Sequence, residues 1–371
     1  ATYFDVNGVM QTAAPNVARF DHEPVNGQLR GLLLEGTRSN LVPSSTVFSA
    51  SARCSVTASS RAAPDGVTIA RKIAEDSTAG ATHYSAQYLN VPAGQTYAHS
   101  VYAAPDGRTQ CGLMFIGANA YAANPYAVFD LTTGTVLNTT RSITASAQKC
   151  ANGFCRVQAI ATTANADTAA GFLLMPAKDG KVAYDGDGRS GIDVFGRQVE
   201  QFGFPSSYVP TSGASATRAA DLTTTTDLSW LTASEGTIVV DAAFVGVLGG
   251  GMFAVSLDDG TNNGIGIYKV NGNGTIAAFS GGAESSSLGS VKDRERFRAG
   301  IGWSARGASA SASLDGARSI TIAQTAAVNP VALSLGSGRG GAFASSIWIR
   351  SLQYWPRRLS DAELSDATTL T

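Results

Sequence analysis

The chain has 371 residues, of which 44% are hydrophobic, 15% are charged and 41 are glycine, so it can form two domains and is not a disordered chain. Its 27 basic and 28 acidic residues give a net charge of −1 and form no basic stripe, which argues against nucleic-acid binding. No apolar run is long enough to cross a bilayer, so we expect no membrane insertion.

The first predicted element is a polar, turn-rich lead-in over residues 1–40. Asn7-Gly8 and Asn26-Gly27 are turn dipeptides, and residues 32–34 form a short buried run. We expect this segment to pack on the first domain or on an assembly partner. The sequence starts at Ala1 rather than Met and shows no signal peptide, so we expect a processed chain or a fragment of a longer protein.

Residues 41–215 form the first predicted domain. Turn dipeptides separate short strands that show no helical periodicity, a pattern typical of an antiparallel β-sandwich. The predicted strands are 68–73, 83–91, 96–103, 112–116, 127–131, 156–162, 172–175 and 192–199. In 96–103, alternation places His99 on the core face, where we interpret it as a hydrogen-bonded core histidine, and Tyr102 on the opposite face.

Two of the 4 cysteines flank a predicted hairpin. Asn152-Gly153 is typical of a two-residue type I′ turn, which would place Cys150 directly opposite Cys155 at a close, non-hydrogen-bonded position. That separation suits a disulfide. Two reduced, half-buried thiols fit the sequence equally well.

A closing strand and a tether end the first domain. Residues 188–200 alternate as a strand, whereas Pro205, Pro210 and the serines and glycine around them predict an extended tether up to about residue 221. The preceding loop holds acidic residues, which are either part of a plain turn or ligands of a structural calcium ion. These calcium candidates are Asp185, Asp187 and Asp193.

Residues 222–371 form the second predicted domain, again a β-sandwich. Its predicted strands are 237–245, 252–257, 266–270, 275–279, 297–304, 308–314, 319–322, 331–335 and 346–354. The acidic loop 258–263 is interpreted as a hairpin tip. Ser360 and Glu363 form a capping box that predicts a short C-terminal helix.

Three stretches resemble a two-module arrangement found in bacteriophage and prophage spike and fibre proteins. The lead-in ATYFDVNGVMQTAAPNVARFDHEPVNGQLRGLLLEGTRSNLV resembles that of phage head-spike or tail-fibre components. Residues 64–103, with CRVQAI and the stretch 188–221, resemble a carbohydrate-binding-module-like jelly roll. SEGTIVVDAAF and SLQYWPRRLSDAELS resemble a concanavalin A-like (laminin-G-like) sandwich.

The resemblance implies a virion surface protein, often a homotrimer, that attaches to host cell-surface glycan and contacts other virion proteins. Attachment to glycan is the role we expect, and the first alternative is a decoration or spacer protein with no glycan ligand. A second alternative is an envelope polysaccharide depolymerase. However, the sequence contains neither a Glu-x-Asp-x-x-Glu motif nor a Gly-x-Ser-x-Gly elbow, so we predict a non-catalytic protein.

Sugar binding uses exposed aromatic rings beside amide or carboxylate groups. By this criterion the candidate ligand residues lie between residues 84 and 126 of the first domain, although each tyrosine could instead be a packing residue. The candidates are Tyr84, Gln87, Tyr88, Tyr102, Asn119, Tyr121, Asn124 and Tyr126. Trp303, Trp348 and Trp355 of the second domain are interpreted as packing residues.

Overall fold

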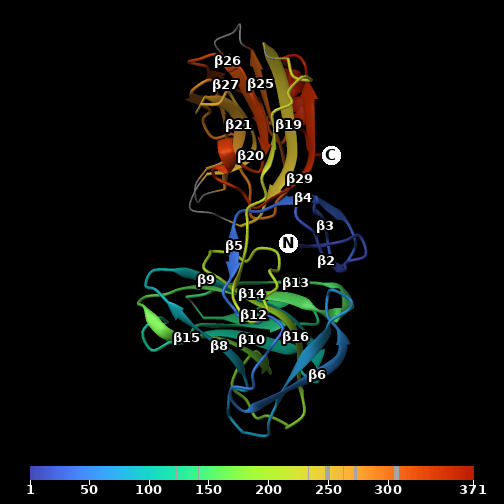
Figure 1. Cartoon of the computed structure of the whole chain (residues 1–371), viewed down its shortest axis with the longest axis vertical. Coiled ribbons are helices and arrows are strands. Elements are labelled where there is room, and N and C mark those ends of the chain that lie inside the picture. Colours follow the sequence, from blue (N-terminus) through green and yellow to red (C-terminus); the bar gives the residue numbers. More distant parts are fainter. Residues whose placement is uncertain are drawn as a thin grey trace. The chain divides into compact units, whose positions relative to one another are not determined.

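The computed structural model describes the whole chain except residues 122, 141, 233, 247–250, 262, 271–273 and 305–308. As predicted, the fold is all-β, with antiparallel sheets and one short C-terminal helix (Figure 1). The chain divides into two compact units. Unit 1 comprises residues 1–17, 22–28 and 38–218, and unit 2 comprises residues 18–21, 29–37 and 219–371.

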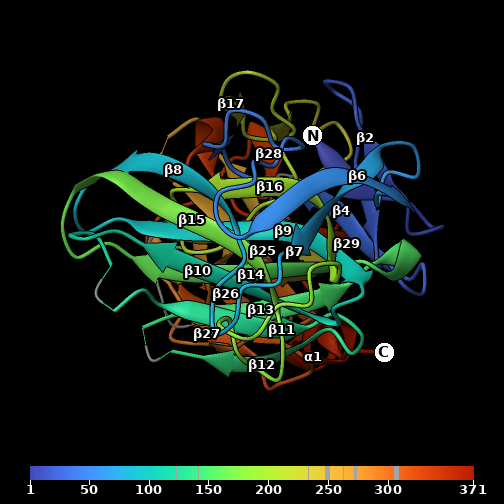
Figure 2. The same cartoon turned by 90° about the horizontal axis from the view of Figure 1, so that it is seen from below.

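Unit 1 is a sandwich of two antiparallel sheets. Its elements are β1 (Thr2–Phe4), β2 (Met10–Thr12), β5 (Arg38–Asn40), β6 (Cys54–Ala62), β7 (Ile69–Glu75), β8 (Ser85–Val91), β9 (Thr96–Asp106), β10 (Gln110–Ile116), β11 (Tyr126–Asp130), β12 (Thr135–Thr139), β13 (Thr144–Lys149), η1 (Ala151–Gly153), β14 (Cys155–Thr162), β15 (Asp167–Ala177), β16 (Gly191–Glu200) and β17 (Ala216–Arg218). The five-stranded sheet has the order β12-β11-β10-β15-β8 and the six-stranded sheet β13-β14-β9-β16-β7-β6 (Figure 2).

The six-stranded sheet of unit 1 is covered on both faces. Its inner face meets the five-stranded sheet in a core that includes Val101, Leu113 and Phe172. Its outer face is covered by a second cluster, in which the lead-in residue Met10 packs with Phe154 and others. The lead-in therefore shields a face that alternation alone would leave to solvent.

The stretch predicted as a tether is instead packed on unit 1. Ser206 donates its backbone N–H and its hydroxyl to the buried Glu200 carboxylate at 2.9 and 2.6 Å. Val209 N–H donates to the Gln198 side chain at 2.7 Å, and Tyr208 lies in the outer-face cluster. The prolines do end the strand, but these side-chain acceptors satisfy the backbone that follows them.

His99 lies in the core of unit 1, as predicted, but it is not hydrogen-bonded as we expected. Its side chain is fully buried against the rings of Phe115 and Phe172, and neither ring nitrogen has a hydrogen-bond partner among the described residues. Burial lowers the pKa of His99 well below its ordinary value of 6.5, and the positive charge of Arg197 lowers it further.

This burial predicts an acid-sensitive unit 1. Below pH 6.5 the unfolded chain binds a proton at His99 that the folded chain does not, so stability falls as pH falls. The expected slope is about 1.4 kcal/mol per pH unit, down to the lowered pKa. The stability of unit 1 can be measured by urea unfolding, monitored by amide hydrogen exchange, at several pH values below 6.5. The slope of this stability against pH should be shallower in His99→Leu than in the wild-type chain. Equal slopes in both proteins would contradict the prediction.

The predicted disulfide between Cys150 and Cys155 does not form, since neither residue is in a disulfide. The turn is present, with positive φ at Asn152 (57°) and Gly153 (77°). However, the strand register pairs Cys155 with Lys149 rather than with Cys150. A shift of one residue turns a side chain to the other face, so Cys150 lies in the outer-face cluster and Cys155 in the main core.

We therefore expect both thiols to survive oxidation of the folded protein. Cys155 donates to the Leu131 carbonyl at 3.1 Å, and burial raises its pKa to about 11, which suppresses the reactive thiolate. After treatment with a mild oxidant, unfolding and alkylation, peptide mass spectrometry should find Cys150 and Cys155 both alkylated. A peptide pair joined through these residues would contradict this expectation.

Unit 2 is a second antiparallel sandwich. Its elements are β3 (Phe20–His22), β4 (Leu29–Leu34), β18 (Thr223–Thr225), β19 (Glu235–Phe244), β20 (Met252–Asp258), β21 (Gly264–Lys269), β22 (Thr275–Ser280), β23 (Ala283–Glu284), β24 (Gly289–Ser290), β25 (Phe297–Ser304), β26 (Ser309–Leu314), β27 (Ile320–Ala323), β28 (Ala332–Leu335), η2 (Arg339–Gly341), β29 (Ile347–Trp355) and α1 (Asp361–Thr368). One sheet has the order β27-β26-β25-β19-β29-β4-β3. The other has the order β18-β28-β20-β21-β22-β23, with β24 also paired to β22.

Two strands of the lead-in belong to unit 2. Strand β4 pairs with β29, so that Leu33 lies opposite Trp348, and Figure 1 shows blue β4 beside red β29. Arg19 is buried and contacts two carboxylates, Glu35 at 2.8 Å and Asp221. Burial by itself lowers the pKa of Arg19, but the attraction of the two carboxylates is stronger, so the pKa is raised overall. The lead-in thus supplies both a strand and a buried cation to unit 2.

The predicted capping box at Ser360 and Glu363 is present and starts α1, whose Leu364 packs on Val239 of the outer sheet face. Trp303 lies in the core of unit 2 and Trp348 is also buried, in agreement with their interpretation as packing residues. None of the helices in the described part of the chain is long and apolar enough to cross a membrane.

Candidate functional site

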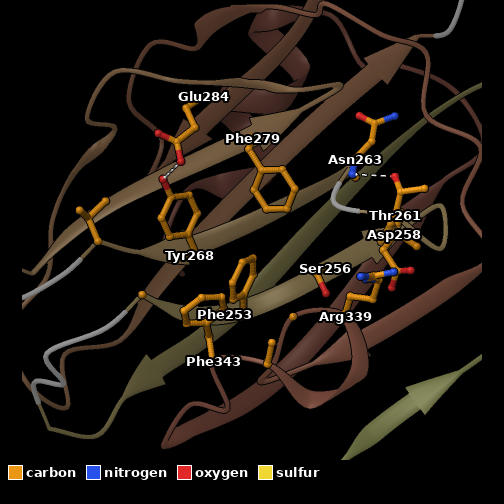
Figure 3. A pocket seen from close by; sticks show the side chains of 16 residues that line it. Phe253, Ser256, Asp258, Thr261, Asn263, Tyr268, Phe279, Glu284, Arg339 and Phe343 are labelled. Atoms are coloured by element: carbon orange, nitrogen blue, oxygen red, sulfur yellow. Dashed lines mark hydrogen bonds between the residues drawn. The ribbon is translucent and has the colours of Figure 1, made fainter.

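A pocket of about 520 Å³ lies in unit 2, over strands β20, β21 and β22 (Figure 3). It lies on the face of this sheet that points away from the sandwich core. Its lining combines aromatic and aliphatic side chains with a few polar ones. The lining residues are Gly251, Phe253, Ser256, Leu257, Asp258, Thr261, Asn263, Gly264, Tyr268, Val270, Phe279, Glu284, Gly338, Arg339, Ala342 and Phe343.

Strand alternation explains why aromatic rings face this pocket. On β21, Ile265 and Ile267 point into the core, so Tyr268 points to the opposite face. On β22, Ile276 and Ala278 enter the core, and Phe279 lies on the pocket face. Each strand thus carries its core residues on one face and an aromatic ring on the other.

The three strand aromatics form one surface. Phe253 is paired with Tyr268 across the strands, and their rings stack at a centroid distance of 5.6 Å. Phe279 stands at 90° to Phe253 at 5.8 Å. Gly266 is paired with Phe279, and a Cβ on Gly266 would lie 2.4 Å from the Phe279 ring. The absence of a side chain at Gly266 therefore lets Phe279 lie against the sheet.

A fourth ring, Phe343, enters from a loop that follows η2. Its backbone has a φ of +54°, a left-handed conformation that bulky residues rarely adopt. Its side chain is 62% exposed, and its ring lies 6.1 Å from that of Phe253. Such strained residues persist only where the surrounding fold offsets their energetic cost, and they are frequent at ligand-binding sites.

The hairpin loop between β20 and β21 forms one end of the pocket. Asp258 accepts a hydrogen bond from Gly260 N–H at 3.0 Å, and Arg339 donates to the Gly260 carbonyl. Asp259, just behind the lining, accepts from the Thr261 hydroxyl and backbone, and these hydrogen bonds hold its pKa below the ordinary range. This loop is the predicted hairpin tip, apart from Asn262, which lies outside the described residues.

Glu284 lies at the other end of the pocket (Figure 3). It accepts a hydrogen bond from the Tyr268 hydroxyl. Burial, together with the neighbouring Glu284 carboxylate, raises the pKa of Tyr268, so its phenol stays protonated and keeps donating. The pocket thus has an aromatic floor with carboxylates at both ends, an arrangement suited to the apolar face and hydroxyl rim of a sugar ring.

The structure places two of the predicted ligand residues in the interior, which corrects the expectation that they present exposed rings. Tyr102 is 1% exposed and packs among Phe4, Phe195 and Tyr208, because the lead-in and the packed tether cover its sheet face. Tyr121 is 4% exposed, and its ring contacts Phe115 and Phe172.

Three other predicted tyrosines share one face of unit 1. Tyr84, Tyr88 and Tyr126 lie on the outer face of the five-stranded sheet. Tyr84 and Tyr126 pack on its outer apolar cluster, and Tyr88 is 48% exposed. Gln87 alternates to the other face of β8, and its side chain donates to the Tyr88 carbonyl. Asn119 and Asn124 are exposed on the loop between β10 and β11.

The three calcium candidates do not converge on one point. Asp185 accepts from Gly80 N–H at 2.6 Å, and Asp193 pairs with Arg61 at 2.9 Å. Asp187 accepts from the Ser190 hydroxyl and backbone, and these hydrogen bonds lower its pKa. Within the described part of the chain, no group of three His, Cys, Asp or Glu side chains could hold a metal ion. The loop therefore has the geometry of a hydrogen-bonded turn.

No protein-family model matches this sequence, and no curated protein matches it. Solved structures with a similar trace include a Ruminococcus gnavus IT-sialidase CBM40, at 17% identity and a TM-score of 0.32, covering 38% of this chain and 85% of that one. Mouse laminin alpha1 chain domains LG4-5 match at 11% identity and a TM-score of 0.26, over 86% and 96% of the two chains.

A Trypanosoma rangeli sialidase in complex with sialic acid also matches, at 9% identity and a TM-score of 0.32. The match covers 84% of this chain but 61% of the sialidase. At these scores the likeness carries no inference about function, so the function must be argued from the pocket itself.

Proposed function

We propose that this chain is a non-catalytic glycan-binding protein and that the pocket of unit 2 holds the sugar. The observation that carries the proposal is the aromatic surface of Phe253, Tyr268 and Phe279, with Phe343 beside it and carboxylates at both ends. Stacking on a ring face and hydrogen bonding to hydroxyl groups are the two interactions by which proteins bind sugars. The same pocket supplies both.

We further propose that the protein acts on the surface of a phage or prophage virion, as a homotrimeric spike or fibre that attaches to host glycan. The support is the resemblance of the lead-in and of the two sandwich sequences to such proteins. Multi-angle light scattering of the purified chain tests the trimer directly. A monomeric mass at micromolar concentration would count against it.

A glycan array with matched variants tests the binding role. The wild-type chain should bind a reproducible set of glycans, and Tyr268→Ala should lose that binding. Tyr88→Ala is the control, since it removes an equally large exposed ring from the other unit. If only Tyr88→Ala loses binding, the binding site lies in unit 1. If the wild-type chain binds no glycan reproducibly, the result favours a decoration or spacer protein.

One observation favours the alternative of a depolymerase. Asp258 and Glu284 both line the pocket, and glycosidases act through two carboxylates on either side of the scissile bond. Incubation with host envelope polysaccharide, followed by a reducing-sugar assay, separates the two functions. Sugar release that disappears in both Asp258→Asn and Glu284→Gln would establish catalysis and overturn the non-catalytic proposal.

A further inference from the structure

We propose that the pocket of unit 2 prefers a saccharide that carries free amino groups, of the 2-amino-2-deoxyhexose class, over a neutral or acidic one. The inference rests on the proposed glycan-binding function and adds the charge of the ligand to it. Three features of the pocket carry it: the sign of its charges, the hydrogen-bonding capacity that remains, and the aromatic faces.

The charges that border the pocket are mainly negative. Asp258 and Glu284 line it, and Asp259 lies directly behind the hairpin tip, with a lowered pKa that keeps it ionised. Arg339 is the one cationic side chain among the described lining residues. Lys269 lies on the other face of β21, where its ammonium group donates to the Gly246 carbonyl at 3.3 Å over the Phe244 ring. The pocket therefore attracts a cation and repels an anion.

Apart from Arg339, the side-chain donors named here are already used within the protein. The Ser256 hydroxyl donates to the Ser337 carbonyl at 2.9 Å, and the Tyr268 hydroxyl donates to Glu284. The Asn263 amide donates to Asp259 and to the Ala327 carbonyl, at 2.9 and 3.0 Å. Arg339 is therefore the main donor left for the carboxylate of an acidic sugar, and the acidic side chains at both ends of the pocket oppose that carboxylate.

The acceptors, in contrast, retain capacity. Asp258 and Glu284 each use one carboxylate oxygen in a hydrogen bond within the described part of the chain, and a carboxylate can accept several. An ammonium group brings three donors and a positive charge, and therefore matches this surplus of acceptors better than a hydroxyl group does.

The aromatic floor adds to the same preference. The faces of Phe253, Tyr268 and Phe279 carry partial negative charge and attract an ammonium ion held above them. Glu284 lies beside Tyr268, and Asp258 lies at the opposite end (Figure 3). Amino groups on different residues of an oligosaccharide could therefore meet carboxylates at both ends of the floor.

Isothermal titration with three matched tetrasaccharides tests the proposal: tetramers of glucosamine, of N-acetylglucosamine and of glucose. The glucosamine tetramer should bind about ten-fold more tightly than the other two, and added salt should reduce that preference because it screens the charges. Glu284→Gln and Asp258→Asn should each weaken the preference. Asp366→Asn, an exposed site on α1 outside the pocket lining, is the control and should keep it.

The outcomes separate this inference from the proposed function. If no saccharide binds in these titrations or on the array, the glycan-binding function itself fails. If the neutral or acetylated tetramer binds as tightly as the amine, the function stands and the charge preference is overturned. A preference that survives unchanged in both carboxylate variants would also overturn it, since it would not come from this pocket.

Discussion

Replacing Arg19 by Met is expected to lower the free energy of unfolding of unit 2 by about 3–5 kcal/mol, the cost of removing one partner from a buried ion pair. Arg19 is 3% exposed and Glu35 is 2% exposed, so the substitution removes a positive charge from beside a buried carboxylate. All 4 tryptophans of the sequence lie in unit 2, at positions 230, 303, 348 and 355. Denaturant unfolding followed by tryptophan fluorescence therefore reports unit 2 alone.

Two further variants make the Arg19 result specific. Arg357→Met removes a cation from the exposed pair with Glu363, in which the side chains are 53% and 46% exposed, and should cost at most about 1 kcal/mol. Arg19→Met combined with Glu35→Gln removes both charges and should recover part of the loss. Equal destabilisation by Arg19→Met and Arg357→Met would show that the buried pair contributes no more than a surface pair.

Replacing Phe343 by Gly and by Ala is expected to separate binding from stability. Both variants lose the ring beside the pocket and should lose about ten-fold in affinity for the glycan, typical of a contact aromatic. Gly adopts the φ of +54° without strain, whereas Ala does not, so Phe343→Gly should be more stable than Phe343→Ala by about 1 kcal/mol. Titration and thermal unfolding of the pair measure the two effects separately.

Phe343→Tyr is the matched control, because it keeps a ring on the same backbone. It should retain the affinity of the wild-type chain. If Phe343→Gly and Phe343→Ala both bind glycan as well as the wild-type chain does, Phe343 is not part of the binding surface. If Gly is no more stable than Ala at this position, the backbone there is not strained.

Alternation, turn dipeptides and the capping box were sufficient to predict two antiparallel sandwiches and a C-terminal helix, because these features depend on neighbours in sequence. The failures involve partners distant in sequence. Tyr102 was predicted to be exposed because nothing local to β9 indicates that Met10 and Tyr208 cover that face. The prediction of a disulfide between Cys150 and Cys155 was wrong because the strand register beyond the correctly predicted turn is offset by one residue.

Only part of the candidate site could be predicted from the sequence. On 264–269, alternation places Ile265 and Ile267 on one face and Tyr268 with two glycines on the other, a signal that could have marked an exposed aromatic. The register that sets Phe253 beside Tyr268 is not encoded locally. Phe343 lies in an irregular loop, where side-chain direction follows from tertiary packing rather than from any periodic pattern.

The division of the lead-in between the two units has a consequence for biosynthesis. Strand β4 is translated long before its partner β29, and the hydrogen bond from Trp348 to Asp21 spans 327 residues. Unit 1 is complete in the nascent chain once Arg218 has been translated, whereas unit 2 must wait until β29 has been translated. Refolding should therefore be biphasic, with the tryptophan signal recovering last, and residues 219–371 produced alone should expose the edge of β29 and aggregate.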